Sequence, residues 1–290
     1  MKINSLLFFS FLLLAVISCN KPPYMPEGPA TYIGTDDNTY GGDNEDDNLL
    51  STIRVMTYNI HAASPPSRPD AVDLPAIATA IRRGNPDIVF LQEVDNGTNR
   101  NGYTGDMAAV LGEALNMNHA FFSARPHLRG YYGVAILSKY PLKSIRKYML
   151  TKESDATEQR VLGTAIIDLP GVDSLVAAVT HLQHNSATNR LQQVRDIVDF
   201  LSPIDQRVII GGDFNELETT VDFFGIFDNA FTRTCKGNCV PTFTALNPRS
   251  VIDYLAYKPA NAFSIVSHNV VNETYASDHL PVIAELRFNR

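Results

Sequence analysis

The sequence has no tryptophan, only three cysteines and no excess of basic residues. Its 24 Lys and Arg residues are outnumbered by 31 Asp and Glu residues, which gives a formal net charge of −7. Bulk attraction to a polyanion such as nucleic acid is therefore not expected, although local basic patches remain allowed. With 44% apolar and 19% charged residues over 290 positions, the composition excludes collagen, a coiled coil and a wholly disordered chain.

The acidic excess lies mainly at the start of the chain. Residues 1–50 hold two bases and seven acids, a net charge of −5, whereas residues 51–290 hold 22 bases and 24 acids. Four prolines precede a run of Asp, Asn and Gly between Gly34 and Asn48, and such a segment cannot bury apolar surface. It is predicted to be a solvated tether, because a calcium loop at 43–47 would lack the full ligand pattern.

No apolar run is long enough for a comfortable membrane helix. The stretch from Leu6 to Ile17 follows Lys2 and has the shape of a signal peptide. The next residues, Ser18 and Cys19, complete a segment that resembles a bacterial lipobox, in which Cys19 becomes the lipidated first residue of the mature protein. A plain signal peptide cleaved near Ser18, or a short membrane anchor, is the alternative.

These features divide the chain into three parts. We expect a signal peptide at 1–18, a lipidated Cys19 with a disordered acidic tether at 19–50, and one catalytic domain at 51–290. The protein is then an exported, membrane-anchored monomer on the periplasmic or cell-surface side. Because an exported chain meets oxidising conditions, Cys235 and Cys239 are expected to form a disulfide. Half of a zinc site is the alternative, but no second cysteine pair exists.

Short apolar runs alternate with amphipathic segments along residues 51–290. Strands are predicted at 54–60, 87–92, 132–137, 161–169, 175–180, 207–211, 251–257 and 281–286, and helices at 74–83, 106–115 and 188–201. Many strands with few helices between them predict an α/β sandwich of two sheets covered by helices.

Polar residues stand at the ends of six of these apolar runs. They are Asn59, Glu93, His181, Asp213 with Asn215, Asp253, and Asp278 with His279. A carboxylate beside a buried strand costs several kcal/mol unless a cation or hydrogen bonds compensate it. Six such strand ends that converge predict a metal-carrying active site. The oxygen donors favour Mg²⁺ or Mn²⁺ over zinc.

The segments that carry these residues also resemble a known family, the endonuclease/exonuclease/phosphatase superfamily, which is DNase I-like. The matching segments, in family order, are Val55–Asn59, Leu91–Val94, Gly133–Ser138, Thr180–Leu182, Gly212–Asn215, Ile252–Tyr254 and Ser277–Val282. The resemblance implies a four-layered α/β sandwich, with two mixed sheets packed face to face and helices on the outside.

The resemblance also implies roles for the strand-end residues. The divalent metal would be held mainly by Glu93, with Asn59 and Asp278 beside it and with Asp213 and Asn215 as further ligands. Asp213 would orient or deprotonate the attacking water, and Asn215 would hold a phosphate oxygen or a second metal. His279, paired with Asp253, would contact the scissile phosphate. His181 would contact phosphate or act as general acid.

Three further residues are candidates for the same site. A glutamate orients the catalytic histidine in DNase-like members, and Glu158 is placed in that role by resemblance. Arg160 is a candidate phosphate contact and Tyr132 a candidate pocket residue. A surface ion pair between Glu158 and Arg160, and simple aromatic packing of Tyr132, remain the alternatives.

The predicted activity is divalent-metal-dependent hydrolysis of a phosphoester by in-line attack of an Asp-activated water. The substrate is left open between nucleic acid, phospholipid and sugar phosphate. A surface nuclease could use bases such as Arg100 and Arg125, which are spread over many segments. A sphingomyelinase-like enzyme could use the aromatic stretch 223–227, which reads equally well as a core helix end. A non-catalytic binding module is the remaining alternative.

Overall fold

The structure is a computed structural model that describes residues 31–32, 38–41, 48–171 and 173–290. The expected signal peptide, Cys19 and most of the acidic segment lie outside these residues, so export and lipidation remain predictions. Within the described ranges, no helix combines the length and the apolar character needed to cross a membrane.

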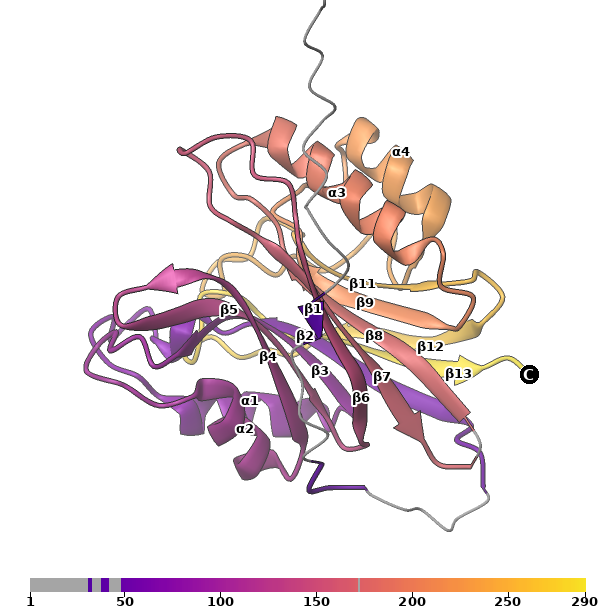
Figure 1. Cartoon of the computed structure of the whole chain (residues 1–290), viewed down its shortest axis with the longest axis horizontal. Coiled ribbons are helices and arrows are strands. Elements are labelled where there is room, and N and C mark those ends of the chain that lie inside the picture. The colour runs from indigo at the N-terminus through magenta and orange to yellow at the C-terminus, as the bar shows by residue number, and fades with distance from the viewer. Residues whose placement is uncertain (1–30, 33–37, 42–47, 172) are drawn as a thin grey trace, which may run out of the picture.

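Two mixed β-sheets form the centre of the molecule (Figure 1). The first has six strands in the order β12-β13-β2-β3-β5-β4, and β2 and β3 are parallel. Its strands are β2 Thr52–Asn59, β3 Ile88–Asn96, β4 Asn118–His127, β5 Gly130–Ser138, β12 Phe263–Val270 and β13 Val282–Phe288.

The second sheet has seven strands in the order β1-β6-β7-β8-β9-β11-β10, and β8 and β9 are parallel. Its strands are β1 Thr31–Tyr32, β6 Leu142–Met149, β7 Val161–Leu169, β8 Asp173–His181, β9 Val208–Asp213, β10 Thr232–Arg233 and β11 Asp253–Lys258. The sequence predicts the strands β2, β3, β5, β7, β8, β9, β11 and β13. The strands β4, β6 and β12 and the two-residue strands β1 and β10 were missed.

Helices cover the outer face of each sheet, and this completes four layers (Figure 1). The six-stranded sheet packs against α1 Leu74–Gly84 and α2 Met107–Leu115, and the seven-stranded sheet packs against α3 Ala187–Leu201 and α4 Val221–Ala230. A short 3₁₀ helix, η1 His61–Ala63, follows β2. The four-layered α/β sandwich predicted from the sequence is confirmed.

Local sequence signals set the helix ends. The side chains of Asp73 and Asp106 accept hydrogen bonds from the first turns of α1 and α2, as N-caps do. Asn85 and Asn116 end the same helices in the left-handed conformation, which asparagine adopts more readily than most residues.

The main core lies between the two sheets, where alternate residues of each strand point inward. In β2, Ile53 and Val55 face this core, and the two-residue period therefore places Asn59 on the same face. In β9, Ile209 faces the same core, and Asp213 follows it at the same parity. The strands thus carry their polar ends into the space between the sheets.

The sheets approach closely beneath the site because β9 carries glycine there. A Cβ on Gly211 would lie 2.3 Å from the ring of Phe90 on the opposite sheet. No side chain can be accommodated at that distance without moving the ring, so the glycine allows the two sheet ends to meet.

Part of the segment predicted as a disordered tether contacts the domain. Strand β1 pairs with β6, and the Asn38 side chain exchanges hydrogen bonds with the backbone of Leu142. Asn118 accepts from the backbone N–H of Tyr40 and donates to its carbonyl. Side-chain amides thus supply backbone partners to the described residues of this segment, where apolar packing does not.

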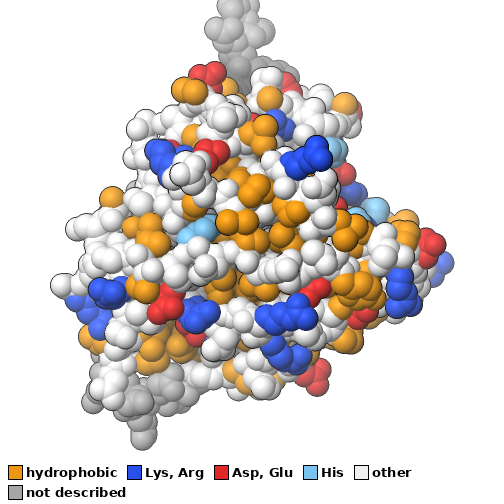
Figure 2. All heavy atoms as spheres, turned by 180° about the vertical axis from the view of Figure 1, so that it is seen from behind, with side chains coloured by type: hydrophobic (Ala, Val, Ile, Leu, Met, Phe, Trp, Pro, Cys, Tyr) orange, Lys and Arg blue, Asp and Glu red, His pale blue; other side chains and the backbone are white. Residues whose placement is uncertain are grey.

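The chain closes a small loop near β11 through a disulfide between Cys235 and Cys239. On the face seen in Figure 2, basic and acidic side chains are scattered among one another and do not gather into one basic area. That distribution agrees with the near-neutral charge of residues 51–290.

Candidate active site

Neighbouring strands deliver the candidate residues in register. In the seven-stranded sheet, His181 of β8 lies opposite Asp213 of β9, and Asp213 lies opposite Asp253 of β11. In the six-stranded sheet, Asn59 of β2 lies opposite Gln92 of β3. Strand ends that are far apart in sequence therefore meet at one edge of the sandwich.

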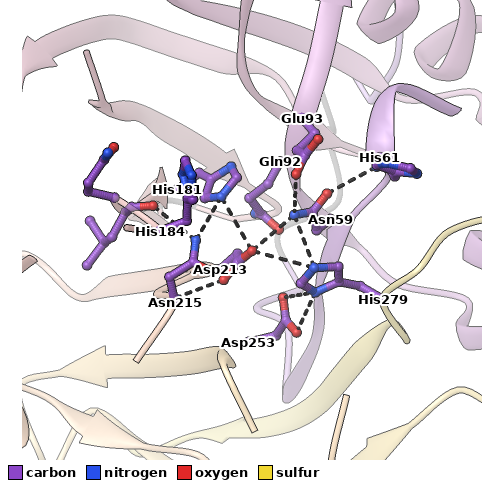
Figure 3. A network of polar contacts seen from close by, with 12 residues as sticks. Asn59, His61, Gln92, Glu93, His181, His184, Asp213, Asn215, Asp253 and His279 are labelled. Carbon is purple, nitrogen blue, oxygen red and sulfur yellow. Dashed lines mark hydrogen bonds and ion pairs between the residues drawn. The ribbon is translucent and has the colours of Figure 1, made fainter. Parts of the chain in front are cut away.

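Asp213 lies at the centre of the polar network drawn in Figure 3. Its Oδ2 accepts a hydrogen bond from Asn59 Nδ2 at 3.0 Å, which joins the two sheets. The same oxygen lies 3.4 Å from His181 Nε2 and 3.7 Å from His279 Nε2. Its other oxygen accepts the backbone N–H of Asn215 at 2.9 Å.

Burial dominates the electrostatics of Asp213. Burial, followed by the nearby Asp253 carboxylate, raises the pKa of Asp213 to about 7. The carboxyl is thus poised to exchange a proton near neutral pH, which is the property of a general base.

His279 and Asp253 form a buried pair. His279 Nδ1 lies 3.0 Å and 3.2 Å from the two Asp253 oxygens, and Thr242 donates to Asp253 at 2.5 Å. Burial alone would lower the pKa of His279, but the Asp253 carboxylate outweighs it and raises that pKa to about 10. The ring therefore carries a positive charge and presents Nε2–H toward Asp213 and the cleft.

His181 has the opposite protonation. Burial, followed by the charge of Arg160, lowers the pKa of His181 well below its ordinary value of 6.5. Asn215 Nδ2 donates to Leu182 O and lies 3.0 Å from His181 Nε2, so Nε2 accepts and the ring proton sits on Nδ1. Nδ1 faces the Tyr132 hydroxyl at 3.4 Å.

Glu93 projects from a bulge in β3. The pairing of β3 with β5 shifts register between Gln92 and Val94, and Glu93 takes a left-handed φ of 56°. The bulge turns Glu93 out of the strand alternation while Gln92 stays fully buried. Glu93 Oε1 then accepts a hydrogen bond from Asn59 Nδ2 at 3.2 Å.

The donor set around Glu93 fits a hard divalent cation. Among the described residues, no Lys or Arg pairs with Glu93 or Asp278, although both line the same cleft. The Asp278 carboxylate lies 3.9 Å from His61 Nδ1 and accepts a hydrogen bond from Ser277 Oγ at 3.4 Å. Carboxylates that share a cleft without a basic partner are what Mg²⁺ or Mn²⁺ requires.

Asn59 does not direct its oxygen toward the cleft as a metal ligand would. The backbone N–H of His61 donates to Asn59 Oδ1 at 3.0 Å, which turns the amide nitrogen toward Glu93 and Asp213. In this arrangement Asn59 holds the two carboxylates in place.

Another close grouping of possible ligand atoms is Asp213, Asp253 and His279, all within 4.8 Å of one another. Both Asp253 oxygens already contact His279, and one also accepts from Thr242. This grouping is therefore better described as a hydrogen-bonded Asp–His pair beside Asp213 than as a complete ligand set.

We refer to Glu93, Asp213, Asp253 and Asp278 as the carboxylate floor.

Basic side chains form the opposite side of the cleft. Arg125 and His127 come from β4, Arg160 directly precedes β7, and His184 follows β8; we call these four residues the donor wall. Glu158, which was expected to orient the catalytic histidine, accepts from Arg125 at 2.9 Å and lies 3.1 Å from Arg160. The contact to His181 Nδ1 is made by Tyr132, because β5 directs that side chain inward.

Several residues of the cleft were not assigned from the sequence. Thr242 supports Asp253, and the ring of Phe243 lies 4.7 Å from that of His279. His127 and His184 line the cleft, and Arg100 stacks over Tyr132 at 5.7 Å. These residues sit in loops or at a hairpin, where no apolar run marks their position.

Comparisons with known proteins agree with this geometry. The family model described as the endonuclease/exonuclease/phosphatase family matches residues 56–279. A direct search of curated proteins finds no match.

Similar solved structures share the fold. An endonuclease/exonuclease/phosphatase from Beutenbergia cavernae is 27% identical over 83% of this chain and 72% of that chain, with a TM-score of 0.70. The human Nocturnin catalytic domain is 21% identical, with coverage of 82% and 94% and a TM-score of 0.65. The mannosyl-6-phosphatase Bt3783 of Bacteroides thetaiotaomicron is 18% identical, with coverage of 81% and 100% and a TM-score of 0.63. The family model covers most of the chain, and we conclude that this protein belongs to the endonuclease/exonuclease/phosphatase family.

Proposed function

We propose that the protein is a divalent-metal-dependent hydrolase of phosphoester bonds. The observation that carries the proposal is the environment of Asp213, whose carboxylate is held by Asn59 and Asn215 and faces two histidines of opposite protonation. The cleft thus combines a base (Asp213), a positively charged imidazolium (His279) and a neutral imidazole (His181). In-line attack on phosphorus needs groups of these kinds.

The chain's own groups then have distinct tasks. Asp213 takes a proton from the attacking water, because its pKa of about 7 lets it accept one near neutral pH. The charged His279, fixed by Asp253, donates Nε2–H to a phosphoryl oxygen. Asn215 offers its amide beside the neutral His181, and both are placed to contact the phosphoryl group or the leaving oxygen.

Glu93 and Asp278 would hold the metal, with Asn59 fixing Glu93. The bound Mg²⁺ or Mn²⁺ supplies charge neutralisation at the phosphoryl oxygens.

The structure supports the three substrate classes, phospholipid, nucleic acid and small molecule, to different degrees. The aromatic stretch 223–227 lies in α4, where Phe223, Phe224 and Phe227 are buried in the core, so it offers no apolar hairpin for a sphingomyelinase-like enzyme. For a nuclease, the one face that Figure 2 shows mixes basic and acidic side chains and offers no basic track on that side. A phosphoester of a small molecule is therefore the proposed substrate class, and the mannosyl-6-phosphatase among the similar structures is a phosphatase of such a substrate by name.

The test is hydrolysis of bis-p-nitrophenyl phosphate, p-nitrophenyl phosphate, plasmid DNA and sphingomyelin, each with Mg²⁺, with Mn²⁺ and with EDTA. We expect turnover of a nitrophenyl ester with either metal and a loss of at least about 10²-fold in EDTA. Asp213→Asn should lower kcat by about 10²-fold or more, because the base is removed. Salt-sensitive cleavage of plasmid DNA as the main activity would instead favour the nuclease.

Metal binding is measured separately by calorimetry. Glu93→Gln should weaken Mn²⁺ binding, whereas Glu113→Gln, at an exposed position of α2, removes the same charge and should leave binding unchanged. Absence of turnover on every ester, together with unchanged Mn²⁺ binding in Glu93→Gln, would support the non-catalytic binding module.

A further inference from the structure

The donor wall consists of two guanidinium–imidazole pairs. Arg125 Nη1 lies 3.3 Å from His127 Nδ1, and Arg160 Nη2 lies 3.3 Å from His184 Nδ1. Because a guanidinium can only donate, each Nδ1 must accept, and each ring therefore carries its proton on Nε2. Burial, followed by Arg100 and Arg125, lowers the pKa of His127, which favours this neutral form.

The arginines of the donor wall also carry one more positive charge than the nearby carboxylate neutralises. Arg125 and Arg160 share the single carboxylate of Glu158, at 2.9 Å and 3.1 Å. The nearby Arg100 has its own partner in Asp95, at 2.8 Å. One guanidinium charge of the Arg125–Arg160 pair is therefore left for a ligand.

Two hydrogen-bond donors of the wall have no partner among the described residues. They are Nε of Arg125 and Nη1 of Arg160, and both atoms are buried. Arg160 as a whole is only 3% exposed, yet it lines the cleft. A buried donor without a partner is unfavourable, and an anion in the cleft would supply the missing acceptor.

Within the wall, Arg125 is set apart from the reacting centre around Asp213, whereas Arg160 lies close enough to His181 for its charge to lower the pKa of that ring. Tyr132 lies between Arg125 and the reacting centre: the Arg125 guanidinium stacks over its ring at 4.9 Å, while its hydroxyl faces His181 at 3.4 Å. The cleft has a volume of about 400 Å³, and Phe243 and Ile252 give it an apolar portion. That space is enough for a sugar or a nucleoside between the floor and the wall.

We propose that the donor wall binds a second phosphoryl group of the substrate, one that is not hydrolysed. This inference rests on the proposed phosphoester hydrolysis and narrows its substrate class to small molecules with two phosphoryl groups. A phosphoryl group has acceptor oxygens and negative charge, and the four wall residues offer donors and one positive charge beyond the one that Glu158 neutralises. The hydrolysed group lies at Asp213, and the retained group lies against Arg125 and His127.

The experiment compares two esters that differ only in the second group. Thymidine 5′-(p-nitrophenyl phosphate) is assayed with and without a 3′-phosphate at low ionic strength, and nitrophenolate release is followed. We expect the 3′-phosphate to raise kcat/KM about tenfold or more in the wild type, equivalent to about 1.4 kcal/mol. In Arg125→Gln this preference should fall to about twofold or less.

Two further variants control the interpretation. Arg195→Gln removes the same charge from an exposed position on α3 and should keep the full preference. Arg125→Lys keeps the charge but loses the planar fork, so its preference should be intermediate. Circular dichroism and thermal melting establish that each variant is folded. Equal rates on the two esters in the wild type, or an equal loss on both in Arg125→Gln, would overturn the proposal, the latter because the wall would then serve the hydrolysed group.

A binding arm separates this inference from the proposed function. Calorimetry in EDTA compares thymidine 3′,5′-bisphosphate with thymidine 5′-monophosphate, and fructose 1,6-bisphosphate with fructose 6-phosphate. Tighter binding of a bisphosphate that is lost in Arg125→Gln would support the wall even if no ester were hydrolysed, and the pair that shows it identifies the nucleotide or the sugar class. An active enzyme that binds mono- and bisphosphates equally would overturn the wall and leave the hydrolase intact.

Discussion

The carboxylate floor and the donor wall face the same cleft but are built from different parts of the fold. The floor residues Asp213 and Asp253 close neighbouring strands, and sheet register fixes them opposite each other. The wall residues Arg125 and Arg160 come from the β4–β5 hairpin and from the segment before β7, and side-chain ion pairs with Glu158 hold them. Backbone register therefore sets the chemistry of the site, whereas side-chain contacts set what else the cleft can bind.

The largest expected effect comes from breaking the floor at Asp253. Asp253→Asn should lower kcat/KM by about 10²–10⁴-fold, because the amide cannot hold His279 in its charged form. The charged ring persists to about pH 10 in the wild type, since Asp253 raises its pKa. Without that carboxylate the pKa falls, so the alkaline loss of activity should begin at a lower pH. A pH–rate profile measures this shift, and an unmoved alkaline limb would contradict the assignment.

A charge change in the donor wall should strengthen the binding of phosphate, whereas the change at Asp253 weakens activity. Glu158→Gln leaves both Arg125 and Arg160 without a carboxylate, so the surplus of positive charge rises from one to two. We expect inhibition by inorganic phosphate to strengthen by about tenfold at low salt and the gain to shrink as ionic strength rises. The free energy of unfolding should fall by about 1–3 kcal/mol, because the buried Arg160 loses a partner. Weaker phosphate inhibition at every salt concentration would refute the charge count.

Tyr132 gives the smallest effect because it touches both regions without reacting. Tyr132→Phe removes the oxygen that faces His181 Nδ1 but keeps the ring under Arg125. We expect kcat to fall by about two- to tenfold with KM nearly unchanged, because the tautomer of His181 is less firmly fixed. A large increase in KM would mean that the hydroxyl binds substrate directly. The Nδ1 and Nε2 nitrogen NMR shifts of His181 report the tautomer independently.

The floor could be predicted from the sequence, whereas of the wall only Arg160 was proposed, as a phosphate contact, and the reason is physical. A carboxylate such as Asp213, directly after the apolar run 208–211, is costly unless something compensates it, and that cost is visible without coordinates. Arg125 stands in a segment with no apolar run, and nothing local indicates that it meets Arg160. The strands β6 and β12 were missed because few of their residues are buried, and β4 was missed because its buried residues alternate with exposed or half-buried ones and form no continuous apolar run. The register of β5 brings Tyr132 against His181, a contact that the sequence did not predict.

The bulge at Glu93 has a consequence for which residue position 93 can carry. A residue with a side chain at a φ of 56° costs about 1–3 kcal/mol compared with an unstrained backbone, and glycine would avoid that cost. A glycine at position 93 would remove the carboxylate at the same time. A less strained backbone and the carboxylate proposed to hold the metal therefore exclude each other at this position.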